Sequence, residues 1–342
     1  MWQHLLVPLD GSPCAEQALP AVARLARANH AAVTLVRVVL PLPDYAYLVD
    51  PVLHVQRTRE AMQDRVEAKR YLAQVEASPY LDGLEVRTVL LACSSICELL
   101  LFAREQDVDL IVMCSHSYTS WERWLHGSVA RHLVRQSVIP LLLLREGGSF
   151  KEQSISHPFR VLVALDGTSS AEAVLPAAAQ LSASLSKPLS GLLHLVRVVQ
   201  PRRTRNDPTV LSSTDKRDLA RASDYLDETE RCLHQGILAP FDVRTTSSLA
   251  LSSDFAGTLA QVAQQELCTS DVAVNPGCDA IALATHGRSG LARWFQGSVT
   301  EQLLERTRLP LLIVRQPQRQ SVASRESASV QRSTPSSHLP VL

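Results

Sequence analysis

HLLVPLDGSPCAEQALP, residues 4–20, and RVLVALDGTSSAEAVLP, residues 160–176, are two versions of one segment and align without a gap. Two more pairs follow in the same order. VTLVRVVLP from Val33 matches LLHLVRVVQP from Leu192, and the 37 residues from Asp109 match those from Asp279. Three matched segments in one order indicate an internal duplication.

Strands and helices are expected to alternate through each copy. Leu5–Leu9 and Val161–Leu165 are apolar runs that end in an Asp-Gly turn, which is typical of strands buried on both faces of a parallel sheet. The further strands are expected at Val33–Val39, Val86–Leu90, Leu110–Met113 and Pro140–Leu144, and at Leu192–Val199, Val243–Ser247, Ala280–Ala284 and Pro310–Val314. This alternation predicts the α/β class, with two tandem, doubly wound, five-stranded parallel-sheet domains.

Helix signals follow the first strand of each copy. In the first, Ser12 can act as the N-cap and Pro13 suits the first helical position. In the second, Ser169 with Glu172 predicts a capping box. Apolar residues then recur at helical spacing, at Ala15, Ala18, Leu19, Val22, Leu25 and Ala26 and at Ala171, Val174, Leu175, Ala178 and Leu181. Further helices are expected over 57–76, 96–106, 216–233 and 255–266 and from near Gly127 and Gly297.

The domain limits follow from changes in composition. We expect a first domain over residues 1–146, a linker rich in Gly and Ser over 147–157, and a second domain over 158–316. Residues 317–342 are dominated by Ser, Arg, Gln and Pro without apolar periodicity, which predicts a disordered tail.

Charge and hydropathy limit the classes of partner that are expected. The 342 residues hold 34 Lys and Arg against 34 Asp and Glu, with no basic block, so neither nucleic acid nor an anionic membrane is an expected partner. The longest apolar run, Val138–Leu144, has the length of a strand and not of a membrane span. The first ten residues do not resemble a secretion signal, and the seven cysteines lack framework spacing, so a cytoplasmic protein with reduced thiols is expected.

Several residues have an alternative interpretation as sites. Cys93 and Cys97, four apart, could share a helical face and hold a metal, although the sequence offers no second pair at ligand spacing. His116 and His286 could act as general bases, but packing within their loops is favoured because no nucleophile or carboxylate partner is apparent. Neither a Walker-type loop nor a G-x-S-x-G elbow occurs.

Two features are expected to meet at the carboxyl ends of the strands. Ligands of doubly wound sheets bind there, where the strand order reverses. Asp10 and Asp166 end the first strand of each copy, and Gly127-Ser128 and Gly297-Ser298 precede the last helix. Free N–H groups and the positive end of a helix dipole make such a Gly-Ser step suited to an anion, or it simply starts a helix.

The segments VALDGT, ATHGRSGLARWFQGSV and LPLLIVR resemble the universal stress protein family, whose fold is of the adenine nucleotide α-hydrolase type. The resemblance extends over both copies. The nucleotide loop of that family reads G-x2-G-x9-G-(S/T). The matching positions keep this spacing, at Ala284, Gly287, Gly297 and Ser298 in the second copy and at Cys114, Ser117, Gly127 and Ser128 in the first.

The resemblance implies an adenine-nucleotide site, with ATP, with or without Mg²⁺, as the cofactor. It places Asp166 and Asp10 on the ribose or adenine side and the main chain of Val198 and Val38 at adenine. Ribose and phosphates would meet the loop glycines, Ser298, and Val299 with Thr300 behind it. Arg288 would lie beside the phosphates, where the first copy has Tyr118.

Three functions therefore remain from the sequence. The first is a nucleotide-binding stress or signalling module that binds mainly in the second copy. The second is a partner-binding scaffold without nucleotide, favoured by the lost glycines of the first copy. The third is a slow ATPase, for which no dedicated base is visible. The resemblance also implies that the two copies pair through their last strands as an internal pseudo-dimer, and it leaves a homodimer open.

Overall fold

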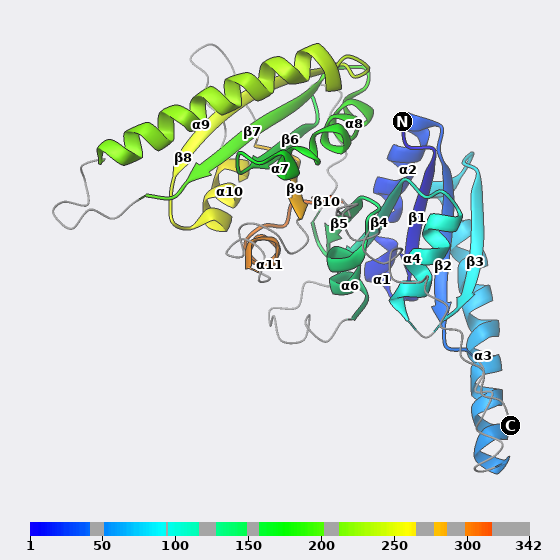
Figure 1. Ribbon diagram of the computed structural model, residues 1–342. Helices are drawn as coiled ribbons and strands as arrows, with labels where there is room; N and C mark the ends of the chain where they lie inside the picture. The colour runs from blue at the N-terminus through cyan, green and yellow to red at the C-terminus, as the bar shows by residue number, and fades with distance from the viewer. Residues whose placement is uncertain are drawn as a thin grey trace, which may run out of the picture.

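The computed structural model describes residues 1–41, 51–93, 95–115, 128–148, 157–201, 212–264, 277–285 and 298–316. Within them the strands form one ten-stranded sheet in the order β3-β2-β1-β4-β5-β10-β9-β6-β7-β8 (Figure 1). The strands are β1 His4–Leu9, β2 Ala32–Val39, β3 Val86–Ala92, β4 Leu110–Ser115, β5 Leu141–Arg145, β6 Arg160–Leu165, β7 Gly191–Val199, β8 Val243–Leu251, β9 Ala280–Thr285 and β10 Leu311–Arg315.

Each half contributes a five-stranded parallel sheet, as the sequence predicts. The order β3-β2-β1-β4-β5 of the first half is repeated by β8-β7-β6-β9-β10 in the second. The halves meet where β5 and β10 pair antiparallel, with Leu312 opposite Leu142. The predicted pairing of the two last strands is therefore present.

Helices cover both faces of the sheet. One face carries α1 Pro13–Glu16, α2 Leu19–Asn29, α3 Pro51–Glu76, α7 Ser169–Glu172, α8 Leu175–Ser186 and α9 Ser213–Cys232. The other carries α4 Ile96–Glu105, α6 Ser128–Gln136, α10 Phe255–Gln264 and α11 Ser298–Arg306. Short turns occur at η2 Pro79–Leu81 and η3 Leu233–Ile237. Apolar side chains of the strands alternate between the two resulting cores, as in a doubly wound fold.

The first helix of each half is interrupted, which the sequence analysis did not predict. α1 ends at Glu16 and α2 starts at Leu19, while α7 ends at Glu172 and α8 starts at Leu175. Pro20 and Pro176 explain the break, because a proline inside a helix removes one hydrogen bond and clashes with the carbonyl four residues earlier. In the first turn of a new helix the same proline is tolerated. The predicted apolar stripes are buried all the same.

The structure confirms the predicted helix N-cap of the first half and corrects the predicted N-cap of the second. The Ser12 hydroxyl accepts a hydrogen bond from the Ala15 amide at 3.2 Å, with Pro13 as the first helical residue. In the second half Thr168, not Ser169, is the N-cap and accepts from the Ala171 amide at 3.2 Å. The capping box is wrong because Ser169 is already helical, and an N-cap residue needs extended backbone angles, which Thr168 has.

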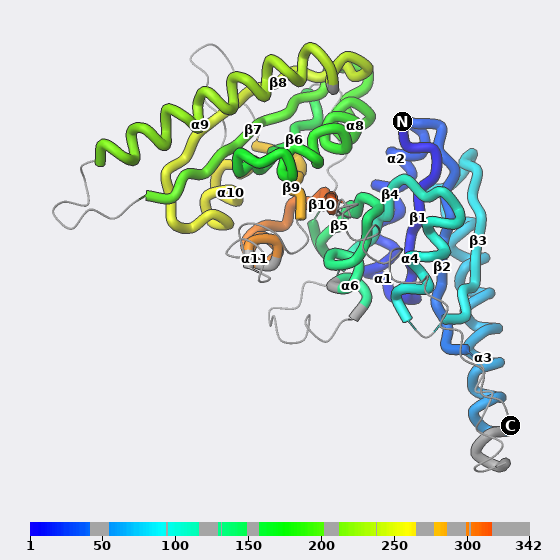
Figure 2. The backbone as a smooth tube through the Cα atoms, viewed as in Figure 1, coloured from blue at the N-terminus to red at the C-terminus, as the bar shows by residue number. Residues whose placement is uncertain are grey.

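Polar contacts join the halves beside the central strand pair. Asn29, at the end of α2, accepts hydrogen bonds from Ser184 at 3.0 Å and from Gln180 at 3.4 Å, both on α8. Lys187 donates to the carbonyl of Ala28 at 3.0 Å. The two halves form separate lobes that meet along β5 and β10, and α3 extends away from the first lobe (Figure 2). In the described part of the chain, no helix combines the length and apolar character that a bilayer span requires.

Candidate functional site

The strand order places a reversal point at the same place in each half, and the carboxyl edge of the sheet at that point is called the crevice. β1 lies between β2 and β4, and β6 lies between β7 and β9. The strand order therefore reverses at β1 and at β6, because the earlier strands are added on one side of each and the later strands on the other. At the carboxyl edge, Asp10 follows β1, and the neighbouring strand β4 ends at Ser115. In the second half Asp166 follows β6, and the neighbouring strand β9 ends at Thr285. Such a reversal point is where doubly wound sheets bind ligands.

The Asp that follows the first strand is held by its own turn. Asp166 Oδ1 accepts from the Thr168 amide at 2.8 Å and from the Thr168 hydroxyl at 2.6 Å, and Asp10 Oδ1 accepts from the Ser12 amide at 2.8 Å. Gly167 has φ +89° and Gly11 has φ +84°, in the left-handed region that favours glycine. The carboxylate is therefore fixed by a turn that other residues would strain.

An arginine packs beneath this turn in each half. A Cβ atom on Gly167 would lie 2.7 Å from Arg197 Nη2, so only glycine admits the guanidinium this close. Arg197 lies 4.9 Å from the centre of the Tyr225 ring, within the range of a cation–π contact. The Tyr225 hydroxyl donates to Glu172 at 2.8 Å, and burial, together with that carboxylate, raises the pKa of Tyr225.

The first half repeats this arrangement more loosely. Arg37 lies 6.0 Å from the Tyr71 ring centre, and its Nη1 donates to the carbonyl of Leu9 at 3.4 Å. Burial first, and then Glu16, raises the pKa of the Tyr71 hydroxyl.

Sequence reasoning did not single out these arginines, although the aligned segments contained the signal. Arg37 and Arg197 are the one charged position shared by VTLVRVVLP and LLHLVRVVQP. A charge kept at the same place in two otherwise apolar strands indicates a specific partner.

Val198 and Val38 occupy equivalent places at the ends of their strands. The β6–β7 ladder ends at Leu165 opposite Arg197, while β7 continues to Val199 along β8 alone. The main chain of Val198 thus extends beyond the end of β6, at the edge of the crevice. Val38 extends past Leu9 in the same way, but its side chain is 38% exposed against 7% for Val198.

The strand-four ends differ between the halves. In the first, the sulfur of Cys114 lies 3.6 Å from that of Cys14 on α1, and Ser115 Oγ donates to the Leu144 carbonyl at 3.4 Å. In the second, Ala284 is buried, and the buried Thr285 Oγ1 has no hydrogen-bond partner within the described residues.

The loops that follow lie outside the described residues. They include Gly287, Arg288 and Gly297 in the second half and Ser117 and Gly127 in the first, together with His116, Tyr118 and His286. The helices beyond them are described. α6 begins at Ser128 and α11 at Ser298, so the predicted Gly-Ser steps do precede a helix, and Thr300 is buried in the first turn of α11.

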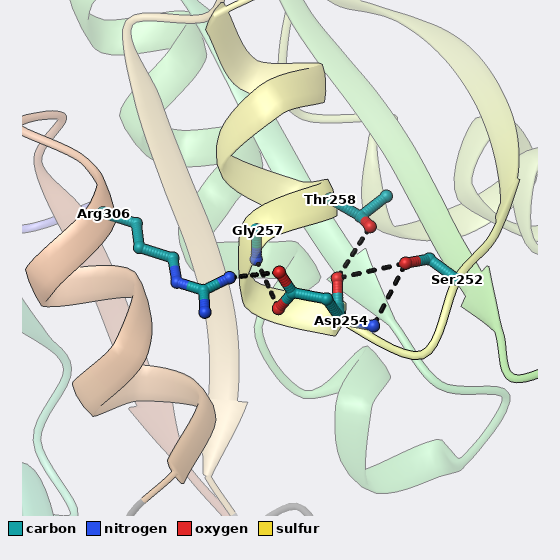
Figure 3. A network of polar contacts seen from close by, with 5 residues as sticks. All are labelled: Ser252, Asp254, Gly257, Thr258 and Arg306. Atoms are coloured by element: carbon teal, nitrogen blue, oxygen red, sulfur yellow. Dashed lines mark hydrogen bonds and ion pairs between the residues drawn. The ribbon is translucent and has the colours of Figure 1, made fainter.

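An ion pair anchors the far end of α11 (Figure 3). Arg306, its last residue, contacts Asp254 Oδ2, while Asp254 Oδ1 accepts from the Gly257 amide at 3.1 Å at the start of α10. The Arg306 guanidinium lowers the pKa of the Asp254 carboxyl. The C-terminal end of α11 is thereby fixed to α10.

The structure does not support the Cys93–Cys97 metal pair. Cys93 precedes α4 and is buried, whereas Cys97 is exposed within it, so the two do not share a helical face. Among the residues that the structure describes, no three His, Cys, Asp or Glu side chains gather as a potential metal site.

Comparison with known proteins agrees with this geometry. The family model described as Universal stress protein family matches residues 1–145 and again 159–315. Universal stress protein MJ0577 of Methanocaldococcus jannaschii is 24% identical over 159 residues, which cover 44% of this chain and 98% of that protein.

Two solved structures match both halves at once. A universal stress protein from Archaeoglobus fulgidus DSM 4304 has TM-score 0.56 and 16% identity, covering 92% of this chain and 98% of its own. PA1789 from Pseudomonas aeruginosa PAO1 has TM-score 0.51 and 13% identity, covering 92% of each chain. These likenesses concern the fold. With the two matched segments they show that the chain belongs to the universal stress protein family and carries its domain twice.

Proposed function

We propose that the second half binds ATP or a related adenine nucleotide in the crevice between β6 and β9, and that the first half binds it weakly or not at all. One observation carries the proposal. The sequence with the spacing A-x2-G-x9-G-S starts in β9, the strand next to β6 at the reversal point, and ends where α11 begins at Ser298. A polyphosphate-binding sequence pattern thus starts in the strand next to the one that leads to Asp166 and ends at a helix N-terminus, which supports the proposal.

Each part of the nucleotide has a proposed contact. Adenine would meet the main chain of Val198, which extends past the end of β6. The carboxylate of Asp166, fixed by Thr168, would accept from ribose hydroxyl groups. The buried Thr285 hydroxyl offers a further polar group at the base of the crevice.

The phosphates would lie at the start of α11. Main-chain amides near Gly287, Gly297 and Ser298, with Val299 and Thr300 behind them, and the positive end of the helix dipole favour an anion there. Arg288 would neutralise part of the charge. Mg²⁺ would be held mainly by phosphate oxygens and water, as is usual for nucleotide-bound Mg²⁺.

The first half lacks two features on which this binding depends. Its loop has Cys114 and Ser117 where the second half has Ala284 and Gly287, so side chains occupy positions where main chain would approach phosphate. Tyr118 replaces Arg288 and adds no positive charge. Binding, rather than turnover, is the proposed activity, because neither the sequence pattern nor the described crevice provides a dedicated general base.

The test is titration calorimetry of ATP against the full chain and two matched variants. Gly297→Val places a branched side chain where phosphate is expected, so affinity should fall at least about tenfold, the equivalent of about 1.4 kcal/mol. Gly127→Val makes the same change in the first half and should leave the affinity unchanged. ATP binding that is insensitive to Gly297→Val would refute the proposed site, and absence of binding to the wild type would leave a duplicated scaffold.

A further inference from the structure

Two thiols meet at the base of the first crevice. Cys14 lies in α1, just after the Asp10 turn, and Cys114 lies near the end of β4. Their sulfur atoms are 3.6 Å apart although the residues are separated by 100 positions, and both side chains are buried. The second half has Ser170 and Ala284 at the matching positions, so the pair belongs to the first half alone.

We propose that Cys14 and Cys114 form a reversible disulfide that makes the first half sensitive to oxidants. The two sulfurs already touch, and they need to approach by only about 1.5 Å more to reach bonding distance. Both lie on backbone elements that pack against each other in the core, so the contact is part of the fold and not a chance meeting of mobile side chains.

Formation of the disulfide balances when hydrogen peroxide is the oxidant. The thiolate of Cys114, whose sulfur accepts the hydrogen bond from the Cys14 thiol, attacks one peroxide oxygen. The O–O bond breaks, water leaves, and a sulfenic acid forms. The Cys14 sulfur then attacks the sulfenic sulfur, and a second water leaves with the Cys14 proton. Two thiols lose two electrons and two protons, and one hydrogen peroxide becomes two waters. A thiol reductant reverses the bond by exchange.

Burial sets the conditions under which the bond forms. Desolvation raises the pKa of both thiols, so few thiolates are present at neutral pH. Oxidation is therefore slower than for a free surface thiol and requires sustained exposure.

The bond would link the two walls of the first crevice. α1 follows the turn that carries Asp10, and β4 leads into the loop that corresponds to the nucleotide loop of the second half. A covalent link there fixes the start of that loop to the strand-one side. The chain would then combine a nucleotide site in one half with an oxidant-sensitive crevice in the other, and the second property does not require the first.

The experiment oxidises the full chain with hydrogen peroxide, blocks the remaining thiols with an alkylating agent after denaturation, and maps peptides without reduction. We expect one linked peptide joining Cys14 to Cys114, lighter than the sum of its parts by two hydrogen atoms and absent after treatment with dithiothreitol. The oxidised wild type should also melt at a higher temperature than the reduced form, since the bond closes a long loop of the unfolded chain.

Two variants borrow the residues of the second half, Cys14→Ser and Cys114→Ala, and each should abolish the linked peptide. Cys97→Ser removes an exposed cysteine and should leave it intact. The proposal is overturned if both thiols of the wild type remain alkylatable after oxidation, or if either sulfur is found linked mainly to another cysteine. The wild-type map decides this even if a variant does not fold.

Discussion

The two halves share a backbone plan and differ at the crevice that each one forms. In both, an Asp-Gly turn follows the first strand and an arginine packs under the glycine. At the strand-four end the first half has two touching thiols, whereas the second has Ala284 and a Thr285 hydroxyl that finds no hydrogen-bond partner among the described residues. The difference teaches that the turn and its arginine belong to the shared fold, while the strand-four end differs from one half to the other.

The two halves also differ in the contact between the arginine and its tyrosine ring. Arg197 lies 4.9 Å from its tyrosine ring and Arg37 lies 6.0 Å from its own. The support beneath the aspartate is therefore tighter in the half whose loop keeps more of the glycine pattern. The two halves therefore differ both in the contact between arginine and tyrosine and at the strand-four end, where the first half has a pair of thiols.

The largest expected effect tests whether the halves depend on each other. Leu142 and Leu312 occupy equivalent positions, are fully buried, and lie opposite each other across the β5–β10 pair. Replacing either leucine by alanine should lower the free energy of unfolding by about 2–5 kcal/mol, through lost burial and the cavity that remains. Urea denaturation monitored by circular dichroism measures the loss.

The double variant provides the control for this prediction. Because the two side chains are neighbours, its loss should differ from the sum of the single losses by about 0.5 kcal/mol or more. If the losses were strictly additive, the two halves would not be energetically coupled at their central strands.

Much of the fold could be predicted because the pattern appears twice. The buried strands and the parallel sheets follow from the apolar runs and their alternation with helices, the pairing of the last strands was implied by the family resemblance, and the structure contains all of them. The break after Glu16 and Glu172 was missed, since the apolar spacing continues through Pro20 and Pro176 although the helix does not. The cap was misplaced by one residue because Thr168 and Ser169 can both serve as caps.

The candidate site could be predicted only in part. Asp10 and Asp166 directly follow β1 and β6, and α6 and α11 begin at the predicted serines, Ser128 and Ser298. Sequence alone could not pair Cys14 with Cys114, or Arg197 with Tyr225, because these contacts depend on how α1 and α9 pack on the sheet. Gly287, Arg288 and Gly297 stay predictions, since they lie outside the described residues.

Acid should destabilise the second half selectively. His194 on β7 is buried between the hydroxyls of Thr246 and Ser248, each 2.9 Å away, and the first half has Thr34 in its place. Burial, with a smaller effect of Arg160, lowers the pKa of His194 from 6.5 to about 4. Because the unfolded state binds the proton more readily, the stability is present above pH 6.5 and is lost as the pH falls toward 4.

The matched variant for this prediction is His194→Thr, which copies the first half. Between pH 7 and pH 5 the wild type should lose about 2 kcal/mol more than the variant, given the two pKa values. Urea midpoints at the two pH values measure it. Equal losses in both proteins would mean that His194 titrates normally in the folded state.

Alanine at the two turn glycines should separate the strain of the turn from the contact with arginine. Gly83 has φ +74° and no atom within 4 Å of an added Cβ, so Gly83→Ala reports the backbone strain alone, about 1 kcal/mol. Gly11→Ala adds a contact at 3.4 Å with Arg37, and Gly167→Ala adds one at 2.7 Å with Arg197. We expect losses of about 1 kcal/mol for Gly11→Ala and about 2 kcal/mol for Gly167→Ala, measured by thermal unfolding.

The informative result is whether Gly167→Ala loses more stability than Gly11→Ala. If Gly11→Ala costs as much as Gly167→Ala, the closer packing of Arg197 has no energetic consequence, and the two turns are equivalent.

The smallest expected effect concerns the anchor of α11. Arg306→Gln gives the second half the residue that the first half has at Gln136 and removes the contact with Asp254 (Figure 3). Both side chains are about half exposed, so the pair should contribute no more than about 0.5–1 kcal/mol, and less at high salt.

Asp254→Ala should cost about 1 kcal/mol because it also removes the N-cap of α10. Unfolding is measured at low salt and in 1 M NaCl, an ionic strength that screens exposed charges. Salt should reduce the loss of stability for Arg306→Gln, which comes from the ion pair, and leave most of the loss for Asp254→Ala, which comes from the N-cap. A loss for Arg306→Gln that does not change with salt would mean that Arg306 acts through its packing on α10 and not through its charge.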